Sequence, residues 1–142
     1  MKQLIVLAAI LPLMLIFMAQ YTLDQKNSVA ISILQEQVYT AKEKAKQEGC
    51  FTEEIKNELK QNISRALNID EEEIIIDATE TRQYRINYFD PSGQRGIIHY
   101  SVSVPIKKIM AGGNLLGIGK DKNTAIYTVS GSTASEYLPK KN

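Results

Sequence analysis

The feature that most constrains this chain is an uncharged run near its N-terminus, from Gln3 through Leu23. At about 1.5 Å of rise per residue it would form roughly 31 Å of α-helix, close to the thickness of the hydrocarbon core of a bilayer. We interpret it as a retained membrane span. A cleaved signal peptide is the alternative, but it would have a shorter apolar core and small residues before the cut. The best cut here follows Ala19, and Phe17 lies two positions before that residue.

The side chains of this run are predicted to pack against lipid or against copies of the same helix. The predicted packing residues are Leu4, Ile5, Leu7, Ala8, Leu11, Pro12, Met14, Leu15, Phe17 and Met18. Pro12 removes a backbone hydrogen bond from the helix interior. Membrane helices tolerate such a proline when neighbouring helices cover the freed carbonyl. Pro12 therefore fits either a helix packed among other helices or an ordinary kinked anchor.

The helix is predicted to continue past the apolar run, because no proline or glycine occurs from Gln20 to Glu48. Apolar residues recur there in three- and four-residue steps, which places them along one face. This stripe comprises Ile31, Leu34, Val38, Ala41 and Ala45. Gly49 is a natural C-terminal stop. We therefore expect one helix of roughly 70 Å over residues 1–48. Residues 1–23 would project as the membrane or filament-core half, and the amphipathic half would pack on a globular head.

Residues 49–142 are predicted to form that head, which gives the chain an α+β fold. Thr52 can cap a second helix that ends near Asn68 and buries an apolar residue at every fourth position. A short β-branched run at 74–76 and alternating apolar residues at 84–88, 98–104 and 124–130 predict a small antiparallel sheet.

Two loops of the head follow from their turn residues. The segment Asp90-Pro91-Ser92-Gly93 is a strong turn signal and predicts that 84–88 and 98–104 form a hairpin. Pro105 is expected to end the second strand or to lie at an edge. The glycine-rich segment 111–119 is predicted to be a structural loop, docked on another part of the chain by its apolar residues.

The sequence offers no constellation that supports a reaction, a cofactor or a metal ion. The formal net charge is +1, which argues against a general nucleic-acid binder. Cys50 is the only cysteine and His99 the only histidine, so internal disulfides and zinc clusters are excluded. The acidic run at 70–73 lacks the spaced oxygen ligands of a calcium loop and is interpreted as a solvated turn. We therefore predict that the chain is not an enzyme.

Several features taken together resemble a known family. The chain starts Met1-Lys2-Gln3 and passes directly into LIVLAAILPLMLIFMA, a long amphipathic helix follows to Gly49, and a small α+β head comes last. This combination resembles a type IV pilin-like subunit, near the small Tad-type and pseudopilin proteins of Gram-positive bacteria. Gln94-Arg95-Gly96, the strand IIHYSVSVP and the closing SEYLP are similar to the heads of such proteins. The resemblance covers the architecture of the whole chain.

The resemblance implies a structural subunit of an extracellular filament, a helical polymer whose core is a bundle of apolar N-terminal helices. Its partners would be copies of itself or related pilin subunits, the lipid bilayer before assembly, and a prepilin peptidase with the assembly machinery. A weak positive-inside bias from Lys2 favours a membrane-inserted precursor with a cytoplasmic N-terminus and an outer head. Pilins commonly carry a glutamate at the fifth mature position. Ile5 stands there if Met1 is the mature start, so that role is carried over to no residue.

An alternative function fits the same sequence. The chain could be a single-span, membrane-anchored extracellular domain of a secretion, conjugation or envelope complex. In that case residues 1–23 would serve as an anchor and nothing more. An unrelated membrane span in their place would preserve function under this interpretation and would destroy it in a filament subunit.

Overall fold

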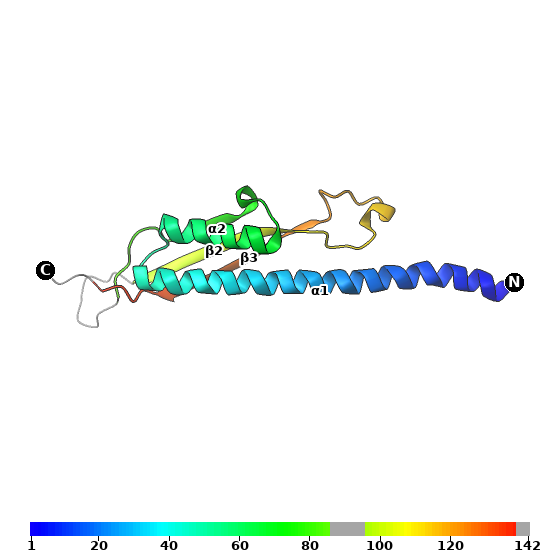
Figure 1. Ribbon diagram of the computed structural model, residues 1–142, viewed down its shortest axis with the longest axis horizontal. Helices are drawn as coiled ribbons and strands as arrows, with labels where there is room; N and C mark the ends of the chain where they lie inside the picture. The colour runs from blue at the N-terminus through cyan, green and yellow to red at the C-terminus, as the bar shows by residue number, and fades with distance from the viewer. Residues whose placement is uncertain (86–95, 139–142) are drawn as a thin grey trace. The chain divides into compact units, whose positions relative to one another are not determined.

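The computed structural model describes residues 1–85 and 96–138 and confirms the predicted α+β fold (Figure 1). Two long helices precede three strands. In chain order the elements are α1 (Lys2–Glu48), α2 (Glu53–Leu67), a short 3₁₀ helix η1 (Glu71–Glu73), β1 (Ile75–Ala78), β2 (Ile97–Lys107), a second 3₁₀ helix η2 (Gly113–Leu116) and β3 (Thr124–Ala134). The sheet order is β1-β2-β3. Strand β1 runs antiparallel to β2, with Ile75 opposite Ser103 and Ala78 opposite Tyr100.

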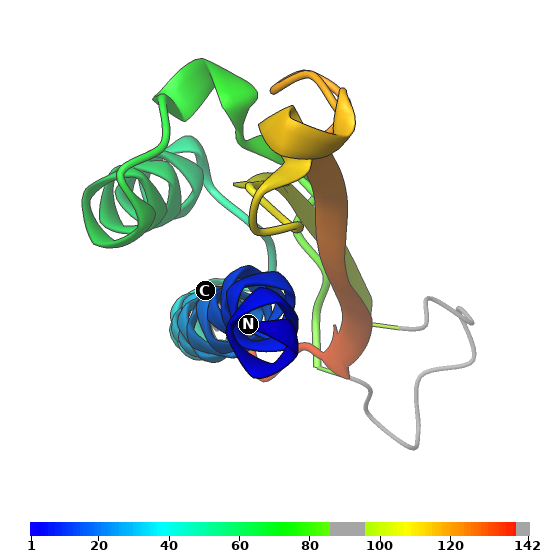
Figure 2. The same ribbon diagram turned by 90° about the vertical axis from the view of Figure 1, so that its right-hand side faces the viewer.

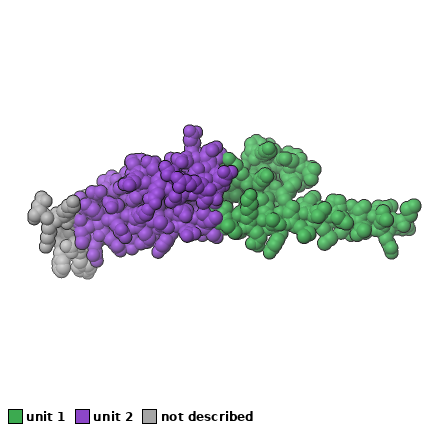
Figure 3. Space-filling view, in the orientation of Figure 1, with its two compact units in different colours: residues 1–31, 105–126 green, residues 32–104, 127–142 purple. Residues whose placement is uncertain are grey.

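The internal contacts divide the chain into two compact units, coloured separately in Figure 3. Unit 1 comprises Met1–Ile31 and Pro105–Ile126, and unit 2 comprises Ser32–Val104 and Tyr127–Asn142. The second half of α1 therefore clusters with the head. Residues 32–48 of α1 belong to the same compact unit as α2 and β1.

Both helices of unit 2 end where local signals predict. Helix α1 ends at Glu48, and Gly49 follows with a φ of +83° that L side chains rarely adopt. The Thr52 side chain caps α2 by accepting a hydrogen bond from the Ile55 amide at 3.3 Å. At the other end Asn68 is left-handed, and its amide donates to the Ser64 carbonyl.

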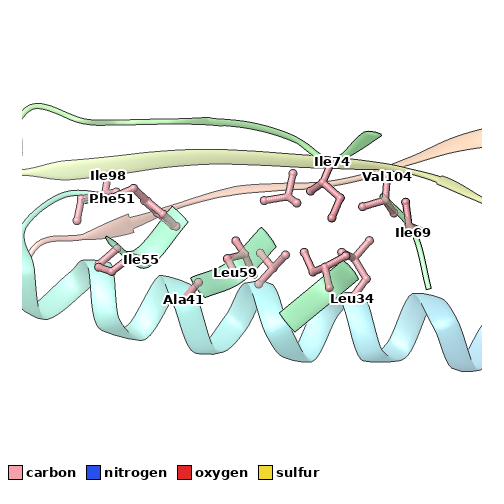
Figure 4. Packing of buried hydrophobic residues seen from close by; sticks show 13 residues of the cluster. Leu34, Ala41, Phe51, Ile55, Leu59, Ile69, Ile74, Ile98 and Val104 are labelled. Carbon is pink, nitrogen blue, oxygen red and sulfur yellow. The ribbon is translucent and has the colours of Figure 1, made fainter. Parts of the chain in front are cut away.

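The core of unit 2 lies between the sheet and the two helices. Figure 2, a view along α1, shows α2 beside α1 and both on one side of the sheet. The buried side chains point into this space from α1, from α2 and from the sheet (Figure 4). They are Leu34, Val38, Ala41, Ala45, Phe51, Ile55, Leu59, Ile63, Ile69, Ile74, Ile98, Val102 and Val104. Four of the five stripe residues of α1 thus belong to the core, whereas Ile31 is half-buried in unit 1.

The strands differ from their predicted bounds in three places. Strand β2 continues through Pro105 to Lys107, so the expectation that Pro105 ends the strand is wrong, whereas its place beyond the β1 pairing fits the expected edge position. The proline is tolerated because β1 pairs with β2 only as far as Ser103, so Pro105 removes no hydrogen bond from that ladder. Strand β3 extends to Ala134, beyond its predicted end at residue 130. The added part contains Gly131, where a Cβ would lie 2.7 Å from the Tyr100 hydroxyl oxygen. Strand β1 begins at Ile75, because Ile74 caps η1 and its amide donates to the Glu71 carbonyl at 3.2 Å.

The predicted hairpin partner of β2 falls largely outside the described residues. Most of 84–88 and the turn at 90–93 belong to the segment 86–95, whereas the described Tyr84 and Arg85 are not in a strand. The described partners of β2 are β1 and β3.

Backbone hydrogen bonds tie the C-terminal end of α1 to later segments of unit 2. The Gln83 amide donates to the Gly49 carbonyl at 2.8 Å, and the Glu136 amide donates to the Lys46 carbonyl at 2.9 Å. Ser135 is 2% exposed, and its hydroxyl donates to the Gln83 carbonyl at 2.7 Å. The end of α1 is therefore held by two segments that are distant in sequence.

Candidate functional site

The N-terminal half of α1 is an apolar helical surface that no other described part of the chain covers. All residues from Met1 to Ala19 are exposed, including all ten predicted packing residues. Leu4 is 74% exposed, Leu11 50% and Phe17 67%. By length and composition the helix is long and apolar enough to cross a membrane. Contiguous apolar surface of this kind marks contact with a membrane or with protein.

Helical structure in this half comes from local sequence. Leucine, alanine and methionine, which dominate it, are strong helix formers. The helix also passes through Pro12 without interruption. The first turn contains no acidic side chain, and the amides of Leu4 and Ile5 bond to the Met1 carbonyl. The structure therefore presents the apolar side chains around a continuous helix.

The exposed surface ends at Gln20, where a loop docks on α1. The Gln20 amide nitrogen donates to the Ile109 carbonyl at 3.0 Å, and its amide oxygen accepts from the Ala111 backbone amide at 2.8 Å. Seven residues further along the helix, the Asn27 side chain donates to the Lys108 carbonyl at 3.2 Å. Gln20 and Asn27 are two turns apart on one face of the helix. We call residues 108–123, between β2 and β3, the docked loop.

A third amide side chain, which belongs to the loop itself, closes the base of the docked loop. The oxygen of the Asn123 side chain accepts from the backbone amides of Ile109 at 2.9 Å and Met110 at 2.7 Å. Its nitrogen donates to the Met110 carbonyl at 2.9 Å, and its backbone carbonyl accepts from the Lys108 amide at 2.8 Å. Asn123 thus fixes the same backbone stretch that Gln20 binds.

The tip of the docked loop is more exposed than the sequence predicts. The sequence predicts that its apolar residues dock the loop, but Leu115 is 82% exposed and Leu116 70%. They lie on η2, which is bounded by Gly112 at φ +70° and Gly117 at φ +76°. Backbone hydrogen bonds from polar side chains of α1 and from Asn123 dock the loop, so its leucines are not needed for docking. The prediction that the loop is docked is confirmed, but Leu115 and Leu116 do not dock it, whereas Ile118 is half-buried.

An open groove of about 720 Å³ lies between the docked loop and α1 in unit 1. Ala19 and Leu23 line it from the helix. Its other lining residues are Lys107, Lys108, Met110, Ala111, Gly112, Gly113, Asn114, Lys120, Asp121, Asn123 and Thr124. The sequence reasoning missed this site. The only signal for it was the pair Gln20 and Asn27, two amides seven residues apart on the helix.

Within residues 1–85 and 96–138, the charged groups with shifted pKa values lie elsewhere, on the surface of unit 2. A hydrogen bond from Lys46 to Glu136, 3.0 Å apart, raises the pKa of Lys46. Hydrogen bonds to Glu53 and Glu80 raise the pKa of Lys56, and the bond from Lys56 lowers the pKa of Glu80. These pairs join α1 to the C-terminal segment and α2 to the segment after β1. Each pair therefore links two segments of unit 2 by a surface hydrogen bond.

Within the described ranges, no group of three or more histidine, cysteine or acidic side chains is placed to hold a metal ion. His99 is exposed on β2, and Cys50 is buried in the turn between the helices, 6% exposed. The acidic run at 70–73 includes η1, which is a turn as predicted. The candidate site is therefore a surface, formed by the apolar half of α1 and the docked loop. Comparisons with protein-family models, with curated proteins and with solved structures find no match to this chain.

Proposed function

We propose that this chain is a structural subunit of an extracellular type IV pilus-like filament and that it assembles through the apolar half of α1. The observation that supports the proposal is the exposed apolar surface from Leu4 to Met18. It lies on the same uninterrupted helix as the core residues Leu34 to Ala45. The subunit would wait in the membrane with its N-terminus in the cytoplasm and would function at the cell surface.

The physical reason is that one apolar surface can satisfy two environments in turn. Lipid covers the side chains before assembly, and the helices of neighbouring subunits cover them afterwards. Small residues such as Ala8 and Ala9 allow two helices to approach closely. A neighbouring helix can also cover the carbonyl that Pro12 leaves without its usual donor.

The alternative is a single-span anchor for an extracellular domain. An anchor needs only length and hydrophobicity, and domains are commonly joined to their neighbours by flexible, polar linkers. Here the apolar residues and the core stripe share one helix, α1, with no linker between them. This continuity favours a helix that takes part in assembly.

The first test is a charge in the middle of the apolar surface. Leu11→Lys should abolish filaments, because a lysine at the centre of an apolar helix costs about 3 kcal/mol in each subunit. Ile75→Lys is the matched control, since Ile75 is 62% exposed on β1 and the same change there should leave filament number unaltered. Filaments sheared from cells are counted by electron microscopy, and protease resistance checks that each head is folded. Normal filament numbers with Leu11→Lys would refute the proposal.

The second test separates a filament subunit from an anchor. Residues 4–19 are replaced by an unrelated apolar helix of the same length, and the chain is confirmed in the membrane fraction. A filament subunit should then be missing from sheared filaments, as measured by mass spectrometry of the sheared material. Incorporation at the level of the native chain would favour the anchor.

A further inference from the structure

The docked loop exposes two leucine side chains at its tip that do not contribute to its docking. Leu115 and Leu116 are adjacent on η2 and exposed by 82% and 70%. The loop base is fixed by the side chains of Gln20 and Asn123, so the tip is presented from an anchored backbone. Exposing two neighbouring leucines to water is unfavourable, and such surface indicates a contact outside the chain.

The docking point lies at the end of the apolar helical surface. Gln20 is the first residue of α1 that is not exposed, and it directly follows the uncharged apolar side chains that end at Ala19. The groove beside it joins Ala19 and Leu23 of the helix to Gly112 and Asn114 of the loop. If the apolar half of α1 spans a bilayer, the loop is therefore held beside the level at which the helix leaves the hydrocarbon.

The charge of the loop matches a negatively charged surface. The docked loop and the three residues before it, 105–123, contain one acidic side chain, Asp121, against four lysines. The lysines are Lys107, Lys108, Lys120 and Lys122. Three of them line the groove together with the apolar Leu23 and Met110. Apolar side chains beside lysines suit a phospholipid, since the acyl chain contacts the former and the phosphate the latter.

We propose that the docked loop is a second membrane contact of this subunit, which binds the surface of an anionic phospholipid bilayer beside α1. Leu115 and Leu116 enter the interface, and the lysines bind lipid phosphates. The proposal rests on the membrane-inserted stage of the proposed function. It goes beyond that stage because it assigns a lipid-binding role to a loop of the head. Since the loop is bonded to Gln20, this contact also sets the depth at which α1 sits in the membrane.

The test uses fluorescent probes on the full chain in lipid vesicles. In a Cys50→Ser background, single cysteines replace Leu115, Leu11 or Ile75 and are labelled with an environment-sensitive fluorophore. Each protein is reconstituted into vesicles with or without phosphatidylglycerol, and quenching by nitroxide-labelled lipids is measured. Leu11 reports insertion of the helix. Ile75, exposed on β1, is the matched control for an apolar surface position that should remain in water.

We expect the Leu115 probe to be quenched in vesicles with phosphatidylglycerol and the Ile75 probe to stay unquenched. Each lysine near an anionic surface is worth roughly a fivefold change in membrane partitioning. Replacing both Lys120 and Lys122 with glutamine should therefore lower the partitioning of the loop into the membrane roughly 25-fold, read from the quenching of the Leu115 probe. The quenching of the Leu11 probe should not change.

Three results would overturn the proposal. If Leu11 is quenched and Leu115 is not, the loop does not bind lipid, although the membrane-inserted stage stands. If neither is quenched, the membrane-inserted stage fails and the loop contact fails with it. If the Leu115 signal responds to protein concentration and not to lipid, the loop contacts another subunit instead.

Discussion

Replacing Gly49 with alanine tests whether the end of α1 is held by the backbone contacts seen in unit 2. Gly49 has a φ of +83°, and an added Cβ would lie 2.5 Å from the Gln83 carbonyl oxygen and 3.0 Å from the Tyr137 Cβ. The left-handed conformation costs an L residue about 1–2 kcal/mol. Displacing the crowded segment costs about 1–3 kcal/mol, and losing the bond from the Gln83 amide to Gly49 costs about 1 kcal/mol. Together these terms predict that Gly49→Ala lowers the free energy of unfolding by about 4 kcal/mol.

Cys50 provides the assay, because it is the only cysteine and is 6% exposed. The full chain in detergent micelles is treated with a maleimide, and the labelling rate is divided by the rate in urea. When closing is faster than labelling, this ratio reports the equilibrium population of the open form. A loss of about 4 kcal/mol should raise the ratio roughly 700-fold, since about 1.4 kcal/mol is a factor of ten.

Gly117→Ala is the matched control. Gly117 has a similar φ of +76°, but nothing lies within 4 Å of an added Cβ. Gly117→Ala should therefore lower the free energy of unfolding only by the cost of the left-handed conformation, about 1–2 kcal/mol. If the two variants label Cys50 at the same rate, the contact between Gly49 and Gln83 does not hold the end of α1, and the reasoning is refuted.

Two further predictions concern unit 2. Leu34→Ala, at a fully buried position of α1, should lower the free energy of unfolding by about 2–5 kcal/mol. Val29→Ala, on an exposed part of the same helix, should change it by less than about 0.5 kcal/mol, and labelling of Cys50 compares the two. Because Lys56 lowers the pKa of Glu80, this pair stabilises the fold at pH values above the usual glutamate pKa, and the contribution is lost as the pH falls through the lowered value. The midpoint of thermal unfolding should therefore differ between the native chain and Glu80→Gln by a constant amount at neutral pH. This difference should shrink in acid. A difference that does not change with pH would contradict the assignment.

The helices could be predicted from the sequence because their signals are local. Gly49, Thr52 and Asn68 lie at the ends of α1 and α2, and each acts through a conformation or hydrogen bond within one turn. The burial of Leu34 and Ala45 follows from helical periodicity alone. Neither inference needs knowledge of a distant partner.

The sheet and the docked loop could not be predicted in the same way, because they depend on pairing between distant residues. Nothing in the run at 74–78 indicates that its partner is Tyr100–Ser103. The leucines of the loop were expected to dock it because buried leucine is the common case. The loop is bound instead by Gln20, Asn27 and Asn123, whose amides look like ordinary surface residues in the sequence.

Docking by Gln20 and Asn123 has a consequence for how this chain can change. Both side chains bind backbone carbonyls and amides of the loop base, which every residue except proline supplies. Substitutions at residues 114–116 therefore leave these bonds intact. The tip can exchange one surface chemistry for another during evolution, or carry a grafted peptide, while its place beside α1 is kept.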